Sequence, residues 1–272
     1  MNKILLFLKN NFFVKLVYNI VYIIGKNAIS FNSAIGRIAT FSYKMFCAGV
    51  NKQFFLKNFL NSLFVNGFCS IPVVGFTGFF IGAVLTLQLF NSLKMFGIES
   101  QIPYVVLIAL MKELSPIMTG VMIIARVASS MSAEIGTMSS NNQIDVLTSM
   151  SINKYRFLYI PRILSLIVAQ PILTTISIIT GVIGSFIIAT KMFDFTDIYF
   201  CNLIYEGFEF SSYLVGVVKG FVFGFIISVI SCYKGNYTKD GAYGVKQTTI
   251  SVVVLCCVYI LMFNFFITLA MG

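Results

Sequence analysis

The 272-residue chain contains no histidine and no tryptophan. Without histidine it has no Ser-His-Asp or Cys-His catalytic arrangement and no histidine-ligated metal site, and without tryptophan it has no indole belt at a membrane surface. Charge is also scarce, because 10% of the residues are charged, against about 25% in an ordinary soluble domain. The composition therefore excludes a soluble protein with a single core, together with several common catalytic mechanisms.

Apolar residues dominate the chain instead. They make up 58% of it, and the mean hydropathy is +0.92. Five segments are apolar and long enough to cross a bilayer, which takes ~20 residues; they cover residues 58–93, 103–131, 163–190, 210–233 and 247–270. We therefore predict an all-α integral membrane protein whose residues 1–272 form a single domain.

The first of these segments is longer than one span requires, and it contains Pro72. A proline inside a helix removes a hydrogen bond and bends the backbone. The surplus length predicts a kink, a re-entrant piece or an interfacial lead-in.

Two segments carry glycines spaced four residues apart. These are Gly78 and Gly82 in the first segment, and Gly216, Gly220 and Gly224 in the fourth. Such spacing lets helix backbones approach closely. It predicts packing within the chain, with a dimer contact as the alternative.

The basic residues are placed unevenly along the chain. Residues 1–57 contain eight Lys and Arg and no acidic residue, so the positive-inside rule places the N-terminus in the cytoplasm and, after five spans, the C-terminus outside. On this topology fourteen basic residues lie inside, and only Lys94 and Lys191 lie outside. Because the basic residues are scattered between apolar runs, the net charge of +10 indicates membrane orientation and no nucleic-acid partner.

Residues 11–26, within this basic N-terminal region, have two faces at helical spacing. Lys15 and Lys26 lie on a polar face, opposite an apolar face that includes Leu16 and Ile20. This pattern predicts an amphipathic helix lying in the membrane interface. A short buried helix is the alternative.

Three charged residues interrupt the second segment: Lys112, Glu113 and Arg126. A charge inside a span costs at least ~2.5 kcal/mol on insertion scales and usually faces protein or water. We therefore interpret these residues as candidates for a substrate path. The alternative is structural pairing with another helix or, for Arg126, snorkelling to the interface; Lys219 in the fourth segment has the same two interpretations.

The loop after the second segment, residues 134–156, predicts a short cytoplasmic helix. Ser140 is followed three residues later by Gln143, which is a capping-box pattern, and Asp145 suits the positive end of a helix dipole. The predicted helix runs over residues 141–151 and exposes Ile144, Leu147 and Ser151 on one face. It is either an ordinary loop helix or a docking surface for a cytoplasmic partner.

The sequence lacks several motifs for cofactors. No GxxxxGK[ST] loop is present to hold ATP, so an ATP-driven function requires a separate ATPase. The six cysteines form no CxxC, and most lie in apolar runs. We expect no catalytic residue, no metal site and no cofactor in this chain.

Two groups of short motifs resemble one known family. The first group is KELSP (112–116), ARVAS (125–129), AEIGTM (133–138), QID (143–145) and PR (161–162), and the second is YKG (233–235), GAYGV (241–245) and TT (248–249). In order and spacing they resemble the MlaE-type permeases of lipid-transporting ABC systems. Asn264 departs from that pattern, since the last span of the family often has an aspartate there.

The resemblance implies a homodimeric permease that works with two ATP-binding ATPase subunits and a periplasmic MCE-domain protein. It implies transport of phospholipids between the inner membrane of a bacterium and its outer envelope, with a plastid inner envelope as a further possibility. The short cytoplasmic helix becomes the coupling helix that contacts the ATPase. Its candidate coupling residues are Glu134, Gly136, Ile144, Asp145 and Leu147, beside the path candidates Lys112, Glu113 and Arg126.

Two other classes of protein fit the composition. An ion- or proton-coupled secondary transporter would use Lys112, Glu113 and Arg126, but the odd number of spans and the lack of an evident inverted repeat argue against it. A membrane scaffold that only anchors partners would leave these charges unexplained.

Overall fold

The computed structural model describes residues 36–37, 40–45, 52–193, 195–239 and 241–271. Contacts divide the chain into two compact units, Met1–Cys47 and Ala48–Gly272. In the first unit the described residues are helical. The interfacial helix predicted over residues 11–26 lies outside the described residues, and everything below concerns the second unit.

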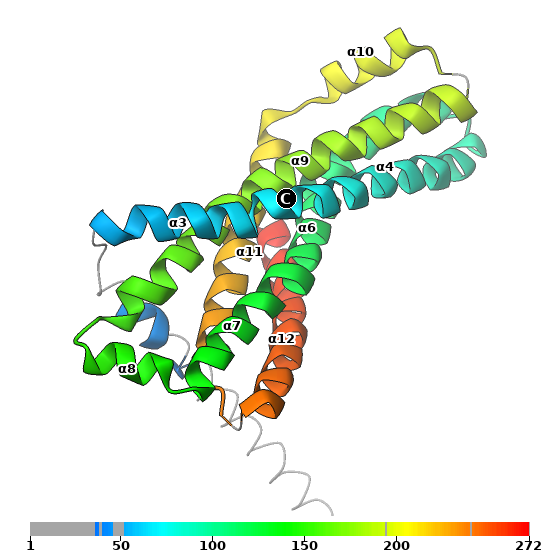
Figure 1. Ribbon diagram of the computed structural model, residues 1–272. Helices are drawn as coiled ribbons and strands as arrows, with labels where there is room; N and C mark the ends of the chain where they lie inside the picture. The colour runs from blue at the N-terminus through cyan, green and yellow to red at the C-terminus, as the bar shows by residue number, and fades with distance from the viewer. Residues whose placement is uncertain (1–35, 38–39, 46–51, 194, 240, 272) are drawn as a thin grey trace, which may run out of the picture. The chain divides into compact units, whose positions relative to one another are not determined.

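Five helical segments of this unit are long and apolar enough to cross a membrane (Figure 1). They run over Leu56–Lys94, Ile102–Ser140, Tyr155–Met192, Phe210–Asn236 and Gly241–Met271. All residues of the five predicted spans fall within them. The described part of the chain is helical and contains no strand, which confirms an all-α membrane protein.

The first segment is broken near its start. Helix α3 (Lys52–Asn66) is followed by the 3₁₀ turn η1 (Phe68–Ser70) and then by α4 (Ile71–Lys94). Pro72 lies in the first turn of α4, where a missing N–H costs no helical hydrogen bond. The helix is interrupted before Pro72, and Pro72 starts the second helix, so the prediction that the proline kinks one continuous helix is wrong. The re-entrant piece and the interfacial lead-in stay predictions.

The second segment is one long helix with two irregular turns. It comprises α5 (Ile102–Ala109), η3 (Leu110–Leu114), α6 (Ser115–Ile123), η4 (Ile124–Ala128) and α7 (Ser129–Ser140), preceded by the 3₁₀ turn η2 (Glu99–Gln101). Both η3 and η4 are π-helical turns, which are rare and often occur at functional sites. Lys112 and Glu113 lie on η3, and Arg126 lies on η4.

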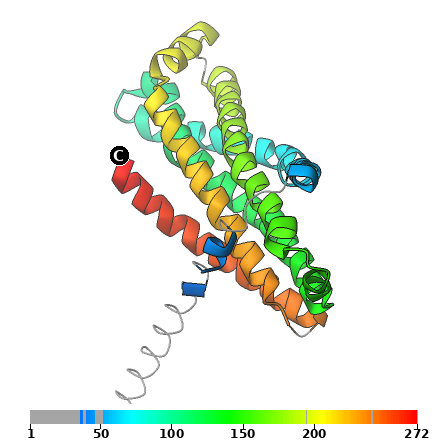
Figure 2. The ribbon, with the colours of Figure 1, turned by 90° about the vertical axis from the view of Figure 1, so that its left-hand side faces the viewer.

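The remaining elements complete the bundle. They are α8 (Gln143–Ser149), η5 (Tyr155–Tyr159), α9 (Ile160–Met192), α10 (Asp197–Gly207), α11 (Phe210–Asn236) and α12 (Gly241–Met271). Helix α9 packs against α3, α4 and α11, while α12 packs against α7 and α11. Figures 1 and 2 show α10 at one end of the bundle and α8 at the opposite end.

The regularly spaced glycines bring helix backbones together within the chain. A Cβ atom at Gly82 of α4 would overlap the backbone of Gly181 of α9, and one at Gly216 of α11 would overlap the Met111 carbonyl. Gly224 likewise faces the Leu166 carbonyl. These contacts confirm the predicted packing within the chain, which joins α4 and α11 to their neighbours.

Candidate substrate path and coupling segment

Lys219 of α11 is a fully buried charged residue in the membrane-spanning part, so its ammonium needs hydrogen-bond partners within the protein. Its side chain is 0% exposed, and an unpaired ammonium is very unfavourable away from water. Nζ donates to three acceptors, each at 2.8 Å: the Lys112 carbonyl oxygen, Glu113 Oε1 and Thr268 Oγ1. Because an ammonium has three hydrogens to donate, its hydrogen-bonding capacity is fully used.

Pro116 helps to explain why a backbone carbonyl serves as one of these acceptors. It lies in the first turn of α6, directly after the π-helical turn η3. Proline has no N–H to donate to a carbonyl of the preceding turn. The turn that carries Lys112 therefore lacks one internal donor, and the ammonium of Lys219 bonds to its carbonyl from the neighbouring helix.

Glu113 is the anion of this site, and its two oxygens are both bonded. Oε1 accepts from Lys219 Nζ and, at 2.8 Å, from Thr268 Oγ1, whereas Oε2 accepts from Asn264 Nδ2 at 2.9 Å. Asn264 and Thr268 are four residues apart, so both lie on one face of α12. We call Glu113, Lys219, Asn264 and Thr268 the Glu113–Lys219 cluster; it joins η3, α11 and α12.

The cluster is closed on one side and open on the other. Lys219 is fully buried, but 36% of the Glu113 side chain is exposed. Lys112, next to Glu113, is half-buried, and among the described residues the two ion pairs are Glu113–Lys219 and Glu134–Arg162. Glu113 and Lys219 neutralise each other. The charge of Lys112 therefore gives η3 and α11 a net positive charge in this region.

Arg126 has a different role from the other two path candidates. Its Nη1 donates to Ser70 Oγ at 2.7 Å, and Ser70 in turn donates to the Asn66 carbonyl at 2.7 Å. Arg126 thus stabilises the break between α3 and α4. The structure brings the Lys112 carbonyl and the Glu113 side chain together with Lys219 and places Arg126 in a separate contact, which favours structural pairing for Arg126.

Only part of this site can be identified from the sequence. The sequence marks Lys219 as a charge with two interpretations and Asn264 as a departure from a family pattern, but it does not mark Thr268 or Ser70. The four-residue spacing of Asn264 and Thr268 in a span is the signal that links them. No comparable signal in the sequence points to Ser70.

The segment predicted to couple to an ATPase contacts three other residues of the chain, through an ion pair, a packing contact and a hydrogen bond. Glu134 forms an ion pair with Arg162 of α9 at 3.1 Å. Gly136 is packed against Thr238, whose Oγ1 would lie 3.0 Å from an added Cβ, and Ser139 Oγ donates to the Asn236 carbonyl at 3.0 Å. Both Glu134 and Gly136 lie on α7, so the helix extends further than predicted, and the connecting loop begins only after Ser140.

Helix α8 confirms the predicted short helix but not the details of its cap. Ser140 Oγ donates back to the Thr137 carbonyl at 3.1 Å, so the predicted capping box with Gln143 is wrong. The N-cap is Asn142, in the left-handed conformation with φ 57° and without a side-chain cap bond. Asparagine adopts this conformation at lower cost than most residues.

The exposed face of α8 also differs from the prediction. Ile144 is only 3% exposed, so the expectation that it faces a partner is wrong. The exposed apolar residues are Val146 at 56% and Met150 at 65%. Leu147 is half-buried and Asp145 is exposed in the first turn, where a carboxylate is favoured by the helix dipole.

These features define a polytopic membrane protein with a charged cluster inside its bundle, as in transporters. Residues 59–270 match the family model described as Permease MlaE. A probable ABC transporter permease protein of Rickettsia conorii is 37% identical over 253 residues, which cover 93% of this chain and 98% of the relative. The chain belongs to the MlaE permease family and is an ABC transporter permease.

More distant relatives extend the same similarity. A probable ABC transporter permease protein of Synechocystis is 31% identical, covering 78% of this chain and 81% of the relative. The chloroplastic protein TRIGALACTOSYLDIACYLGLYCEROL 1 of Arabidopsis thaliana is 30% identical, covering 77% of this chain and 60% of the relative. The similarity therefore extends to a cyanobacterium and to a chloroplast.

The Glu113–Lys219 cluster predicts that the fold loses stability when one charge of the ion pair is removed. Replacing Lys219 with Met leaves Glu113 without its ion-pair partner inside the membrane. We expect a loss of roughly 1–3 kcal/mol, below the ~3–5 kcal/mol of a fully buried pair because Glu113 is partly exposed. Thermal unfolding of the purified chain in detergent measures it, with the exposed Lys191→Met as the control.

The double variant Glu113→Gln/Lys219→Met tests whether the effect comes from the pair. It should recover part of the lost stability, because neither member of the pair is then left charged without the other. Destabilisation equal to the sum of the two single variants would show that the two residues act independently.

Proposed function

We propose that this permease moves phospholipids across its membrane, driven by ATP hydrolysis on a separate ATPase subunit. The observation that carries the proposal is the Glu113–Lys219 cluster, with the half-buried Lys112 on the same turn as Glu113 and without an ion pair among the described residues. A phospholipid has an anionic phosphate and apolar chains, so a cationic group within apolar walls matches both of its parts. The name of the Arabidopsis relative also contains that of a glycerolipid.

The geometry of the cluster favours this function over ion- or proton-coupled transport. A coupling site needs groups that change their protonation or exchange a bound ion. Lys219 has all three hydrogens bonded within the chain, and both oxygens of Glu113 are occupied. Lys112 is the charged group of this region without an ion pair among the described residues, and it suits an anion.

The proposed assembly contains two copies of the permease, two ATPase subunits and an MCE-domain protein. Helix α12 supports the homodimer, because an apolar stripe along it is exposed at Val254, Val258, Leu261 and Phe265. The exposed face of α8 supports the ATPase contact. We place the complex in the bacterial inner membrane with the N-terminus in the cytoplasm, as the distribution of basic residues favours.

A transport assay with two charge variants tests the proposal. We expect Lys112→Met and Glu113→Gln to reduce ATP-dependent transfer of a labelled phospholipid by roughly tenfold or more, because a hydrogen bond to a charged group contributes ~1.5–3 kcal/mol. The measurement uses the permease with its ATPase in proteoliposomes, and Lys191→Met is the matched control. Full transport by both variants at normal expression would exclude a path role for the two residues.

A second prediction concerns α8. Val146→Glu should leave the fold intact, since Val146 is exposed, but it should release the ATPase because the added carboxylate would be buried without a partner. Copurification of the ATPase with the tagged permease measures the effect. Gln143→Glu, which adds the same charge at an exposed polar position of the same helix, is the control.

Leu147→Glu probes the same contact from a half-buried position and so also disturbs internal packing. If Val146→Glu retained the ATPase as well as Gln143→Glu does, and transported lipid normally, then α8 would not be the coupling helix.

A further inference from the structure

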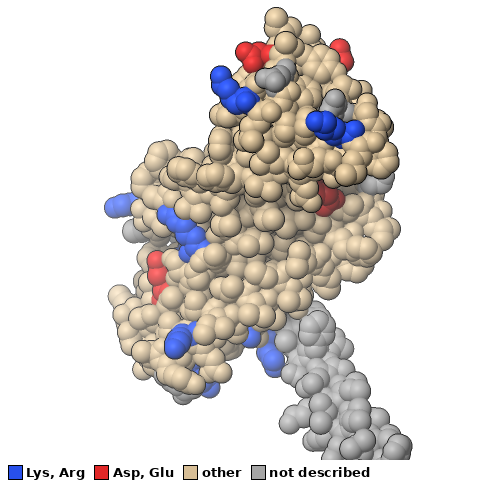
Figure 3. Space-filling view, turned by 90° about the vertical axis from the view of Figure 1, so that its right-hand side faces the viewer, with Lys and Arg blue, Asp and Glu red and all other residues tan. Residues whose placement is uncertain are grey.

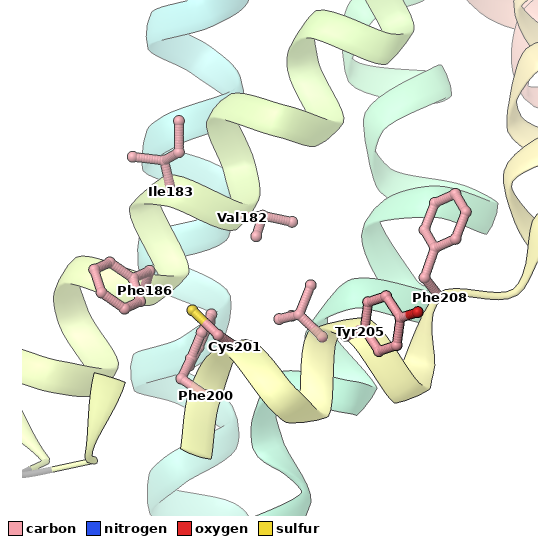
Figure 4. Close-up of a pocket in the computed structure, with 8 residues that line it drawn as sticks. Val182, Ile183, Phe186, Phe200, Cys201, Tyr205 and Phe208 are labelled. Atoms are coloured by element: carbon pink, nitrogen blue, oxygen red, sulfur yellow. The ribbon is translucent and has the colours of Figure 1, made fainter. Parts of the chain in front are cut away.

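A groove lies between α9 and α10, at the end of the bundle opposite α8. It has a volume of about 800 Å³. Figure 4 shows the side chains of the two helices facing each other across it. The lining residues are Val182, Ile183 and Phe186 of α9, Phe200, Cys201, Ile204 and Tyr205 of α10, and Phe208. We propose that this α9–α10 groove binds one acyl chain of a membrane lipid, at a site separate from the Glu113–Lys219 cluster.

The groove is held open by contacts at both ends of α10. Near the N-terminal end, the rings of Phe186 and Phe200 meet edge to face with centroids 5.3 Å apart. At the C-terminal end, Gly207 lies against Tyr104, whose Cδ2 would be 2.6 Å from an added Cβ. With its ends fixed to α9 and α5, α10 bridges the space between them, and the middle of the helix is not collapsed onto α9.

The walls match a hydrocarbon chain better than a polar ligand. They are aliphatic and aromatic, with the thiol of Cys201 and the hydroxyl of Tyr205 as the polar side-chain groups of the lining. Its α9 wall belongs to the membrane-spanning segment Tyr155–Met192. On the face shown in Figure 3 most of the surface is uncharged. Because the α9 wall belongs to an apolar segment that is long enough to span the bilayer, we expect the groove to face the lipid chains.

A second apolar groove continues the first along α9. It has a volume of about 460 Å³ and lies between α4 and α9, lined by residues that include Pro72, Phe76, Ile176 and Ile183. Ile183 lines both grooves. From Ile176 to Phe186 the track spans ~15 Å at 1.5 Å per residue, which is half of the ~30 Å hydrocarbon core. This length fits the chain of a lipid in a single leaflet, the one at the α10 end.

The floor of the groove connects it to the centre of the bundle. Val182 and Ile204 pack against a buried group made of Leu107, Met111 and Ile178. Met111 directly precedes Lys112 on η3. An acyl chain in the groove therefore contacts residues that pack against the same buried group as η3, the turn that carries Lys112 and Glu113.

A photo-crosslinking experiment tests the proposal without ATP or transport, so its outcome is independent of the proposed function. The full-length permease is placed in nanodiscs of phosphatidylglycerol containing a small fraction of the same lipid with a diazirine on its acyl chain. After irradiation, mass spectrometry locates the adducts. We expect them on the groove residues, Ile183, Phe186, Cys201 and Ile204.

Cys201→Trp fills the groove from an exposed position and should reduce these adducts at least fivefold. Ile198→Trp places the same side chain on an exposed residue of α10 that does not line the groove, and it should leave them unchanged. Thermal unfolding confirms that both variants fold.

The native thiol of Cys201 gives a second measurement on the unmodified chain. Its alkylation should be at least fivefold slower in lipid nanodiscs than in a short-chain detergent, whereas that of Cys257, on α12, should change less. Adducts absent from the groove residues, or unaffected by Cys201→Trp, would overturn the proposal. So would crosslinks to a second protein chain in their place, which would assign the groove to a subunit interface.

Discussion

The bundle depends on satisfying one ammonium group in an apolar environment. Lys219 is fully buried on α11, where bulk water does not reach its charge. Its three hydrogen bonds must therefore come from neighbouring helices, and they do so from η3 and α12. The positions of these two elements around α11 follow from this requirement.

Several local features are consistent with that constraint. Pro116 removes a donor from the turn that offers the Lys112 carbonyl, and Gly216 allows the backbones of α11 and η3 to approach closely. Helix α12 exposes much of its surface, so its polar bonds through Asn264 and Thr268 hold its end to the cluster. In the proposed mechanism the same arrangement neutralises Glu113 and leaves Lys112 available for an anion.

The spans and the charged residues within them were predictable from local sequence alone. Hydropathy identifies a span, and the free-energy cost of a charge in the membrane makes each charged residue stand out. The pairing was not, since Glu113 and Asn264 are 151 residues apart and helical periodicity gives no information across such a distance. The π-helical turns were also not predictable, because the periodicity of the sequence was interpreted with the 3.6 residues per turn of an α-helix. Helix α7 is longer than its polarity suggests because it packs on α11 and α12, and Ile144 is buried although the pattern alone allowed it to face a partner.

The most direct measurement is a structure of the permease with its ATPase in a phospholipid nanodisc. We expect a lipid phosphate within about 4 Å of Lys112 Nζ, beside an intact ion pair between Glu113 and Lys219. A lipid bound in the bundle with its phosphate distant from Lys112, and Lys112 paired instead with a carboxylate of the protein, would contradict it.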